Sequence, residues 1–99
     1  MRIFSRKTLR EFWELPDHAD SEQPLKAWYD EASKANWKTP NEIKALYKNA
    51  SILKDGRAVF NIHGNKYRLI VKINYDFAVI YIRFVGTHKQ YDKINANEV

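Results

Sequence analysis

Residues 59–85 read VFNIHGNKYRLIVKINYDFAVIYIRFV, and apolar side chains recur in them with a period close to two. This alternation is typical of β-strands that bury one face. Gly64-Asn65 suits the positive φ angles of a first hairpin turn. At the second break in the pattern, Phe77 would resist a positive φ, which favours a four-residue loop around Asp76. The pattern therefore predicts an antiparallel meander.

The sequence before this segment has the spacing of helices. Apolar residues recur there every three or four positions, and Ser5 and Ser21 are the expected N-caps of two helices. Thr39–Glu42 forms a capping box for a third helix, and Thr87–Gln90 forms another for a short last one. Residues 2–5 could add a short first strand. The expected buried helix positions are Leu9, Phe12, Trp13, Leu25, Trp28, Tyr29, Ala32, Ala35, Ile43, Leu46 and Tyr47.

The predicted strands have one apolar and one cationic face. Because the apolar face must meet the helices, we expect an α+β fold: N-terminal helices on one face of a three- or four-stranded antiparallel sheet, then a short C-terminal helix. The apolar positions are Phe60, Ile62, Leu69, Val71, Ile73, Ala78, Ile80, Ile82 and Phe84. The opposite face carries Asn61, Arg68, Ile70, Lys72, Tyr81 and Arg83.

The cationic face is expected to bind an anion. A hairpin that pairs Asn74 with Val79 would place Ile70 opposite Arg83, with Arg68 as the diagonal neighbour of Arg83. Two adjacent guanidinium groups repel each other, and none of the three strands carries an acidic residue. The arrangement therefore favours a bound phosphate or an acidic partner. The alternative is a solvated outer face without a ligand.

Length and composition are those of one folded domain over residues 1–99, since 44% of the side chains are hydrophobic. The absence of cysteine excludes disulfides, thiolate zinc sites and a catalytic thiol, and it indicates a cytoplasmic location. The first 15 residues lack the apolar region of a signal peptide. The longest apolar run, residues 77–82, is much shorter than a membrane-spanning helix, so no membrane partner is expected.

The net charge of +5 is unevenly distributed. Residues 51–99 hold eight basic and four acidic side chains, and Asp76 is the one acidic residue between Arg57 and Lys89. A phosphate chain is the usual partner of such a surface. The alternative is mild basicity without a specific partner.

His88 is the histidine best placed for chemistry. It follows the strand that bears Arg83 and begins the last predicted helix, whose positive end disfavours imidazolium and suits a proton acceptor or donor. Tyr91 lies one turn later and can share its face. No metal-ligand spacing or cofactor motif is present, so we expect no metal and no cofactor. Metal-free acid–base chemistry at a phosphate remains; the alternative is a helix that only packs on the sheet edge.

Two blocks of this sequence resemble the HigB toxin family. Residues 59–69, VFNIHGNKYRL, match the family pattern F-N-x-x-G-N-x-x-R, and residues 81–92, YIRFVGTHKQYD, match I-R-x-x-x-T-H-x-x-Y-D. The resemblance implies a RelE-like α+β toxin that cleaves mRNA on the translating ribosome without a metal. It also implies a co-encoded HigA-type antitoxin with a helix-turn-helix domain.

The motif positions suggest roles for individual residues. The expected catalytic residues are Arg68 and Arg83 as phosphate cations, His88 as principal acid–base group and Tyr91 as a second proton donor or stacking surface. The expected RNA-binding residues are Asn61, His63, Lys66, Lys72, Tyr81, Lys89 and Asp92. Two other functions stay open at this point: a gyrase-directed toxin of the related ParE type, and a non-catalytic RNA-binding module.

Overall fold

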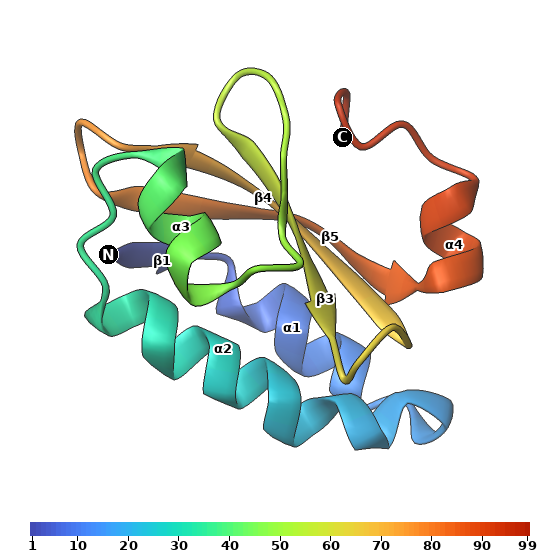
Figure 1. The fold of residues 1–99 in the computed structure, drawn as a ribbon. Coiled ribbons are helices and arrows are strands. Elements are labelled where there is room, and N and C mark those ends of the chain that lie inside the picture. The colour runs from blue at the N-terminus through green and yellow to red at the C-terminus, as the bar shows by residue number, and fades with distance from the viewer.

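The computed structural model describes residues 1–99 and shows one sheet with the first helices on one face and the short last helix apart from them (Figure 1). The strands are β1 (Arg2–Phe4), β2 (Ser51–Ile52), β3 (Arg57–Ile62), β4 (Tyr67–Asn74) and β5 (Val79–Thr87). They lie in the order β1-β5-β4-β3-β2. The helices are α1 (Arg6–Trp13), the 3₁₀ helix η1 (Pro16–Ser21), α2 (Glu22–Lys34), α3 (Pro40–Leu46) and α4 (His88–Asp92).

The α+β class and the predicted meander are confirmed, but the sheet has five strands instead of three or four. Strands β3, β4 and β5 pair antiparallel. β2 adds two residues beside β3, and β1 runs parallel to β5 with Ile3 opposite Ile80. β1 is the short first strand expected over residues 2–5, whereas β2 has only two residues and is too short to show alternation, so the sequence pattern did not reveal it.

The core lies between the helices and the inner face of the sheet, which is the face that α1 and α2 cover. Trp28 of α2 is 2% exposed, and its ring meets that of Phe60 edge-on with centroids 5.4 Å apart. Leu46, predicted to be buried, is exposed because α3 ends at it. The sheet contributes Ala58, Phe60, Ile62, Tyr67, Leu69, Val71, Ile73 and Ile80 to this core. The helices contribute Leu9, Phe12, Trp13, Leu25, Trp28, Ala32 and Ile43.

A β-bulge changes the predicted register of β5. Asn74 pairs with Val79 as predicted, but Ile70 lies opposite Phe84 instead of Arg83. The ladder passes from the Val71–Ile82 pair directly to the Ile70–Phe84 pair, which leaves Arg83 as the extra residue. Phe84 therefore lies on the outer face of the sheet, and its predicted place on the inner face was wrong.

Both turns of the meander contain residues with positive φ, although not always the predicted ones. His63 (φ 55°) and Gly64 (φ 64°) have these angles in the first turn, where Gly64-Asn65 was expected. The second loop has four residues, 75–78, as predicted. Its positive φ of 55° falls on Ala78, and Phe77 avoids such an angle.

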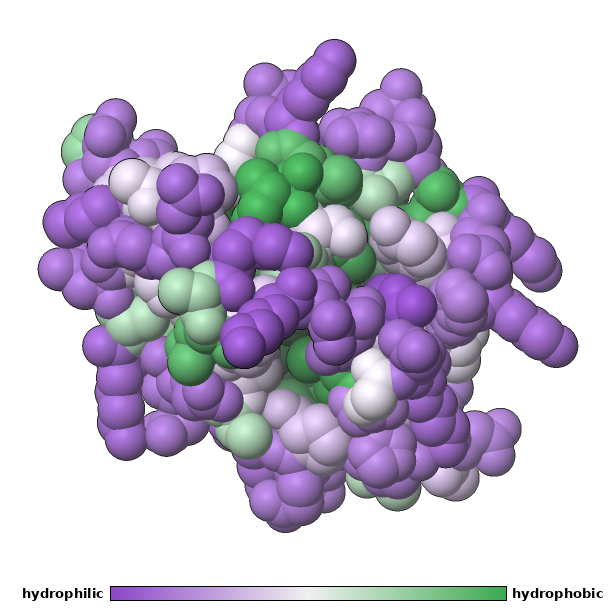
Figure 2. Space-filling view, in the orientation of Figure 1, coloured by the Kyte–Doolittle hydropathy of each residue, from purple (hydrophilic) through white to green (hydrophobic).

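The surface is largely hydrophilic in the orientation of Figure 1, with smaller apolar patches between polar side chains (Figure 2). None of the helices has the length and apolar character needed to span a lipid bilayer.

Candidate nucleic-acid interface

The outer face of the sheet is the face of β3, β4 and β5 opposite α1 and α2, and cross-strand pairing arranges its side chains in rows. Val59, Ile70 and Phe84 are successive neighbours across the three strands, and Ile70 is fully buried. We call these three residues the apolar row. A polar group beside α4 lies on one side of this row, and a second polar group around Lys72 and Tyr81 lies on the other.

The group beside α4, here called the α4 end, consists of Asn61, Arg68, His88, Tyr91 and Asp92. The predicted capping box fixes where α4 begins: the Gln90 N–H donates to Thr87 Oγ1 (3.1 Å), and the Thr87 N–H donates to Gln90 Oε1 (2.9 Å). The His88 N–H donates to the carbonyl oxygen of Lys66 at 3.2 Å. The exposed His88 ring lies with Nε2 3.5 Å from Asp92 Oδ1. The cap therefore sets the place of the imidazole relative to the first hairpin turn.

Arg68 joins this group from β4. Its side chain donates to the carbonyl oxygens of Asn65 (2.9 Å) and Tyr67 (3.3 Å), and its guanidinium carbon lies 5.8 Å from the centre of the Tyr91 ring. Across the strand, Arg68 faces Gly86. A Cβ on Gly86 would lie 2.5 Å from Cζ of Phe84, so the glycine leaves the room that this ring occupies. A guanidinium, an imidazole and a phenol thus lie around one end of the outer face.

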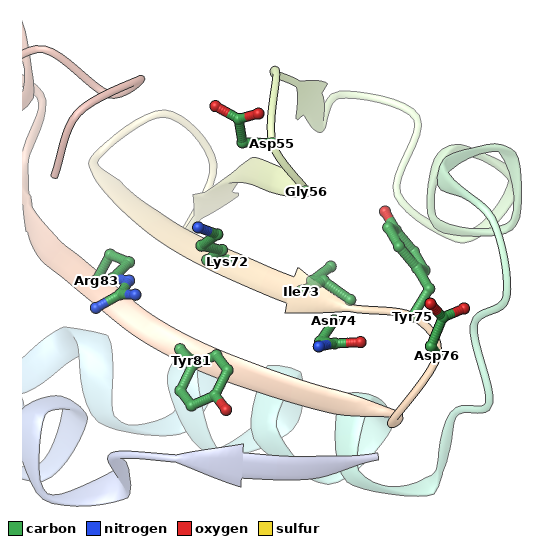
Figure 3. Close-up of a pocket in the computed structure, with 9 residues that line it drawn as sticks. All are labelled: Asp55, Gly56, Lys72, Ile73, Asn74, Tyr75, Asp76, Tyr81 and Arg83. Carbon is green, nitrogen blue, oxygen red and sulfur yellow. The ribbon is translucent and has the colours of Figure 1, made fainter.

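The polar group on the other side of the apolar row lines a hollow of about 500 Å³. Lys72, Tyr81 and Arg83 form one side of it (Figure 3). The loop before β3 forms another side, where Gly56 accepts from the Ile73 N–H at 2.8 Å. A Cβ on Gly56 would lie 2.4 Å from the carbonyl oxygen of Ile73, so only glycine permits this close approach. The remaining lining residues are Asp55, Ile73, Asn74, Tyr75 and Asp76.

Aromatic and cationic side chains alternate beside the hollow. The Arg83 guanidinium carbon is 5.7 Å from the centre of the Tyr81 ring. The Tyr81 ring stacks on Phe4 of β1, with centroids 5.9 Å apart and planes at 20°. Arg2 lies in turn over Phe4, at 5.2 Å. Such alternation of rings and cations is typical of surfaces that bind single-stranded nucleic acid.

Lys66 and His63 lie at the first hairpin turn, where both approach Asp20 of η1. Lys66 donates to the Asp20 carboxylate, Tyr67 donates to it at 2.5 Å, and His63 Nε2 lies 3.6 Å away. The hydrogen bonds from Lys66 and Tyr67 lower the pKa of Asp20. The same contact with Asp20 raises the pKa of Lys66. The Asp20 carboxylate therefore balances the positive charge of Lys66, and the contact joins η1 to the hairpin.

The structure places the predicted site residues in three groups. Arg68, His88, Tyr91, Asn61 and Asp92 are at the α4 end, with Lys89 exposed on the same helix. The hollow holds Lys72, Tyr81 and Arg83. His63 and Lys66 belong to the Asp20 contact.

Sequence reasoning missed Asp20, Phe4 and Asn74. Asp20 has no motif around it. Phe4 reaches the outer face only through the parallel pairing of β1 with β5, in which it lies opposite Tyr81. Asn74 does carry a signal, since asparagine just before a turn often accepts a backbone hydrogen bond, as Asn74 does from the Phe77 N–H.

The amino-acid sequence matches a described protein family. The sequence model of HigB_toxin, the RelE-like toxic component of a toxin-antitoxin system, matches residues 21–94, about three quarters of the chain. This chain belongs to the HigB toxin family. The matched segment of this chain includes α4 and the strands β3, β4 and β5.

Curated relatives extend the match over almost the whole length. The mRNA interferase toxin HigB of Escherichia coli K12 is 31% identical over 99 residues, which cover 97% of this chain and 92% of the relative. The mRNA interferase HigB of Shigella flexneri has the same identity and coverage. The resemblance to the HigB family is confirmed.

Proposed function

We propose that this HigB-family toxin is an endoribonuclease that cleaves mRNA on the translating ribosome without a metal ion. The observation that carries the proposal is the outer face, where Arg68 and Arg83 flank the apolar row and Arg68 lies 5.8 Å from the ring of Tyr91, on the same short helix as His88. In this proposal the guanidinium groups of Arg68 and Arg83 bind one phosphate above Phe84 from its two sides. Two relatives of this chain are named mRNA interferases, and these names support the same reaction.

RNA supplies its own nucleophile in this reaction. The 2′-oxygen of a ribose attacks the adjacent phosphorus as its proton leaves, and the 5′-oxygen of the next nucleotide departs with a proton. The products are a 2′,3′-cyclic phosphate and a 5′-hydroxyl. His88 is the principal group for proton transfer, and Tyr91 is the second proton donor. Arg68 and Arg83 stabilise the charge that develops on the phosphorane oxygens.

Asp92 and the remaining outer-face residues assist these groups. Asp92 lies 3.5 Å from the His88 ring and orients it. Asn61, Lys72, Tyr81 and Lys89 bind the RNA on either side of the cleaved phosphate. His63 and Lys66 stay outside the site in this proposal, because Asp20 already engages them.

The ribosome is part of the proposal because the site is shallow. The side chains of His88 and Asp92 are both more than half exposed at the α4 end. Holding the 2′-oxygen in line with the leaving oxygen lowers the activation free energy of cleavage by a large fraction. The ribosome would supply this positioning, so we expect free RNA to be a poor substrate. The toxin would act in the cytoplasm and be neutralised by a HigA-type helix-turn-helix antitoxin.

Expression without an antitoxin tests the function. We expect growth arrest, loss of translation and cut mRNA. His88→Ala should lower the rate of cleavage about 10²- to 10⁴-fold, the usual contribution of general acid–base catalysis. Arg68→Ala should also relieve the arrest, and both variants should keep the unfolding temperature of the parent protein.

Arg10→Ala is the matched control for Arg68→Ala, since Arg10 is an exposed arginine on α1, under the opposite face of the sheet. It should remain toxic. Arrest with intact mRNA and damaged DNA would replace the proposal by gyrase poisoning. A fully toxic His88→Ala protein would remove His88 from the reaction, and arrest with neither cut mRNA nor damaged DNA would favour a non-catalytic RNA-binding module.

A further inference from the structure

We infer that the hollow beside Tyr81 binds the base of a nucleotide next to the cleaved phosphate, and that it selects bases with an exocyclic amino group over uracil. The inference rests on the proposed function, because it places the same RNA strand along β5. It assigns a recognition role to Asn74, Asp55 and Asp76, which have no part in the proposed chemistry.

Tyr81 provides the surface on which a base can stack. It is 40% exposed, its ring stacks on Phe4, and the Arg83 guanidinium carbon lies 5.7 Å from the ring centre. A ring that is fixed in this way loses little conformational freedom when a base stacks on it. Base–aromatic stacking tolerates any base, so Tyr81 supplies affinity rather than selectivity.

Asn74 provides a hydrogen-bond donor with a fixed direction. Its Oδ1 accepts from the Phe77 N–H at 3.2 Å, which sets the orientation of the amide. The amide nitrogen then lies on the side of Tyr81, as Figure 3 shows. A donor in this place can bind a ring nitrogen or carbonyl oxygen on the edge of a base that stacks on Tyr81.

Asp55 and Asp76 provide the complementary acceptors. Both carboxylates lie at the rim of the hollow, and neither belongs to any ion pair of this structure. Carboxylate oxygens only accept hydrogen bonds, so they favour amino hydrogens on a base edge and disfavour carbonyl oxygens. Adenine, cytosine and guanine each carry an amino group, and uracil carries none. An amino group offers two N–H donors to these two acceptors, whereas uracil offers only its N3–H between two carbonyl oxygens, so the pair of carboxylates disfavours uracil.

The charges around the hollow suit the phosphates of the same strand. Lys72 and Arg83 have no acidic partner within 4 Å, so both cations can bind phosphate. Arg83 stands between the hollow and Phe84. A strand whose cleaved phosphate lies above Phe84 would reach the hollow with its neighbouring base. The hollow and the α4 end lie on the same face of the sheet. The C-terminal residue reaches this face too, where the Val99 oxygen accepts from the Arg57 side chain opposite Lys72.

The test compares where the toxin cuts, by mapping the new 5′ ends of cellular mRNA after expression. The parent protein should disfavour uracil at one fixed position next to the cut. Asn74→Asp keeps an oxygen for the Phe77 N–H but removes the donor. At that position, the ratio of cuts beside uracil to cuts beside the other bases should change about fivefold, the effect of one hydrogen bond. Preferences at all other positions should stay as they are.

Phe77→Ala is the control for a change in the loop itself, since Phe77 is 76% exposed and does not line the hollow. Its profile should equal that of the parent protein. An unchanged profile for Asn74→Asp, or a parent protein that accepts uracil as readily as other bases at every position, would overturn the inference while leaving the nuclease proposal intact. If the parent protein leaves mRNA uncut, it is the proposed function that fails. If Asn74→Asp loses only antitoxin binding, the hollow is a protein contact instead.

Discussion

The two faces of strand β4 differ in charge and in exposure, except at Ile70, which is apolar and buried on the outer face. Leu69, Val71 and Ile73 point to the helices and are at most 4% exposed, whereas Arg68 and Lys72 alternate with them on the outer face and stay accessible. The inner face supplies the hydrophobic free energy of folding. The outer face supplies charge that has little stabilising effect, because Arg68 has no acidic partner and Lys72 faces Arg57 across the ladder. Stability and function are therefore separable on one strand.

The strongest way to break this separation is to disturb the inner face. Trp28→Ala removes a ring that is almost fully buried against Phe60, and it should lower the free energy of unfolding by about 3–5 kcal/mol. Chemical denaturation would measure the loss. Toxicity should fall only as far as the folded fraction falls, so cleavage per folded molecule should equal that of the parent. A stable Trp28→Ala protein that no longer cleaves would contradict the separation.

A smaller change sharpens the comparison from the outer face. Tyr81→Ala removes the stacking surface and should weaken RNA binding by about 1–3 kcal/mol, that is, by roughly fivefold to 150-fold. The free energy of unfolding should fall by no more than about 1.5 kcal/mol, the usual value of an aromatic pair such as Phe4–Tyr81. Affinity for a ribosome–mRNA complex and the denaturation midpoint would be measured on the same protein. A loss of stability as large as that of Trp28→Ala would place Tyr81 in the core instead.

The smallest effect is expected at the Asp20 contact, which lies at the border of the two faces. The pKa of Asp20 is lowered in the folded protein by hydrogen bonds from Lys66 and Tyr67. Its stabilising contribution is therefore complete above the ordinary pKa of an aspartate and is lost as the pH falls through the lowered folded value. Asp20→Asn should unfold more easily than the parent near neutral pH, and the difference should shrink once the pH drops below about 4. Denaturation midpoints across that range would measure it; a difference that grows on acidification would show that Asp20 is not held as a carboxylate.

The alternation of apolar residues and the helix caps made much of this fold predictable. Irregular elements and contacts between distant segments were not predictable. The period of two in β4 determined which side chains face the helices, because any shift by one residue would bury Arg68 and expose Leu69. The capping box at Thr87 located α4 and thus His88. By contrast, Ile82-Arg83-Phe84 still reads as regular alternation, and nothing in those three residues marks the extra one. A contact between distant segments, such as Asp20 with Lys66, leaves no local trace in the sequence.

The candidate site was predictable as a set of residues but not as an arrangement. The outer-face positions Asn61, Lys72 and Tyr81 followed from the alternation alone. The division of this face by Val59, Ile70 and Phe84 depends on the bulge, which moves Phe84 to the outer face and Arg83 toward Lys72. The Phe4–Tyr81 stack depends on the parallel edge strand, which brings together residues 77 positions apart.

The bulge also makes Arg83 the one residue of β5 that could be deleted without moving its neighbours. Ile82 and Phe84 already face consecutive residues of β4, so the ladder would close into unbroken pairing if the residue between them were lost. A deletion farther along the strand would exchange the two faces of the residues between it and the bulge. The sheet is therefore complete without the Arg83 guanidinium. Inserting or deleting one residue at the bulge could add or remove a charge while the pairing of β4 with β5 stays the same.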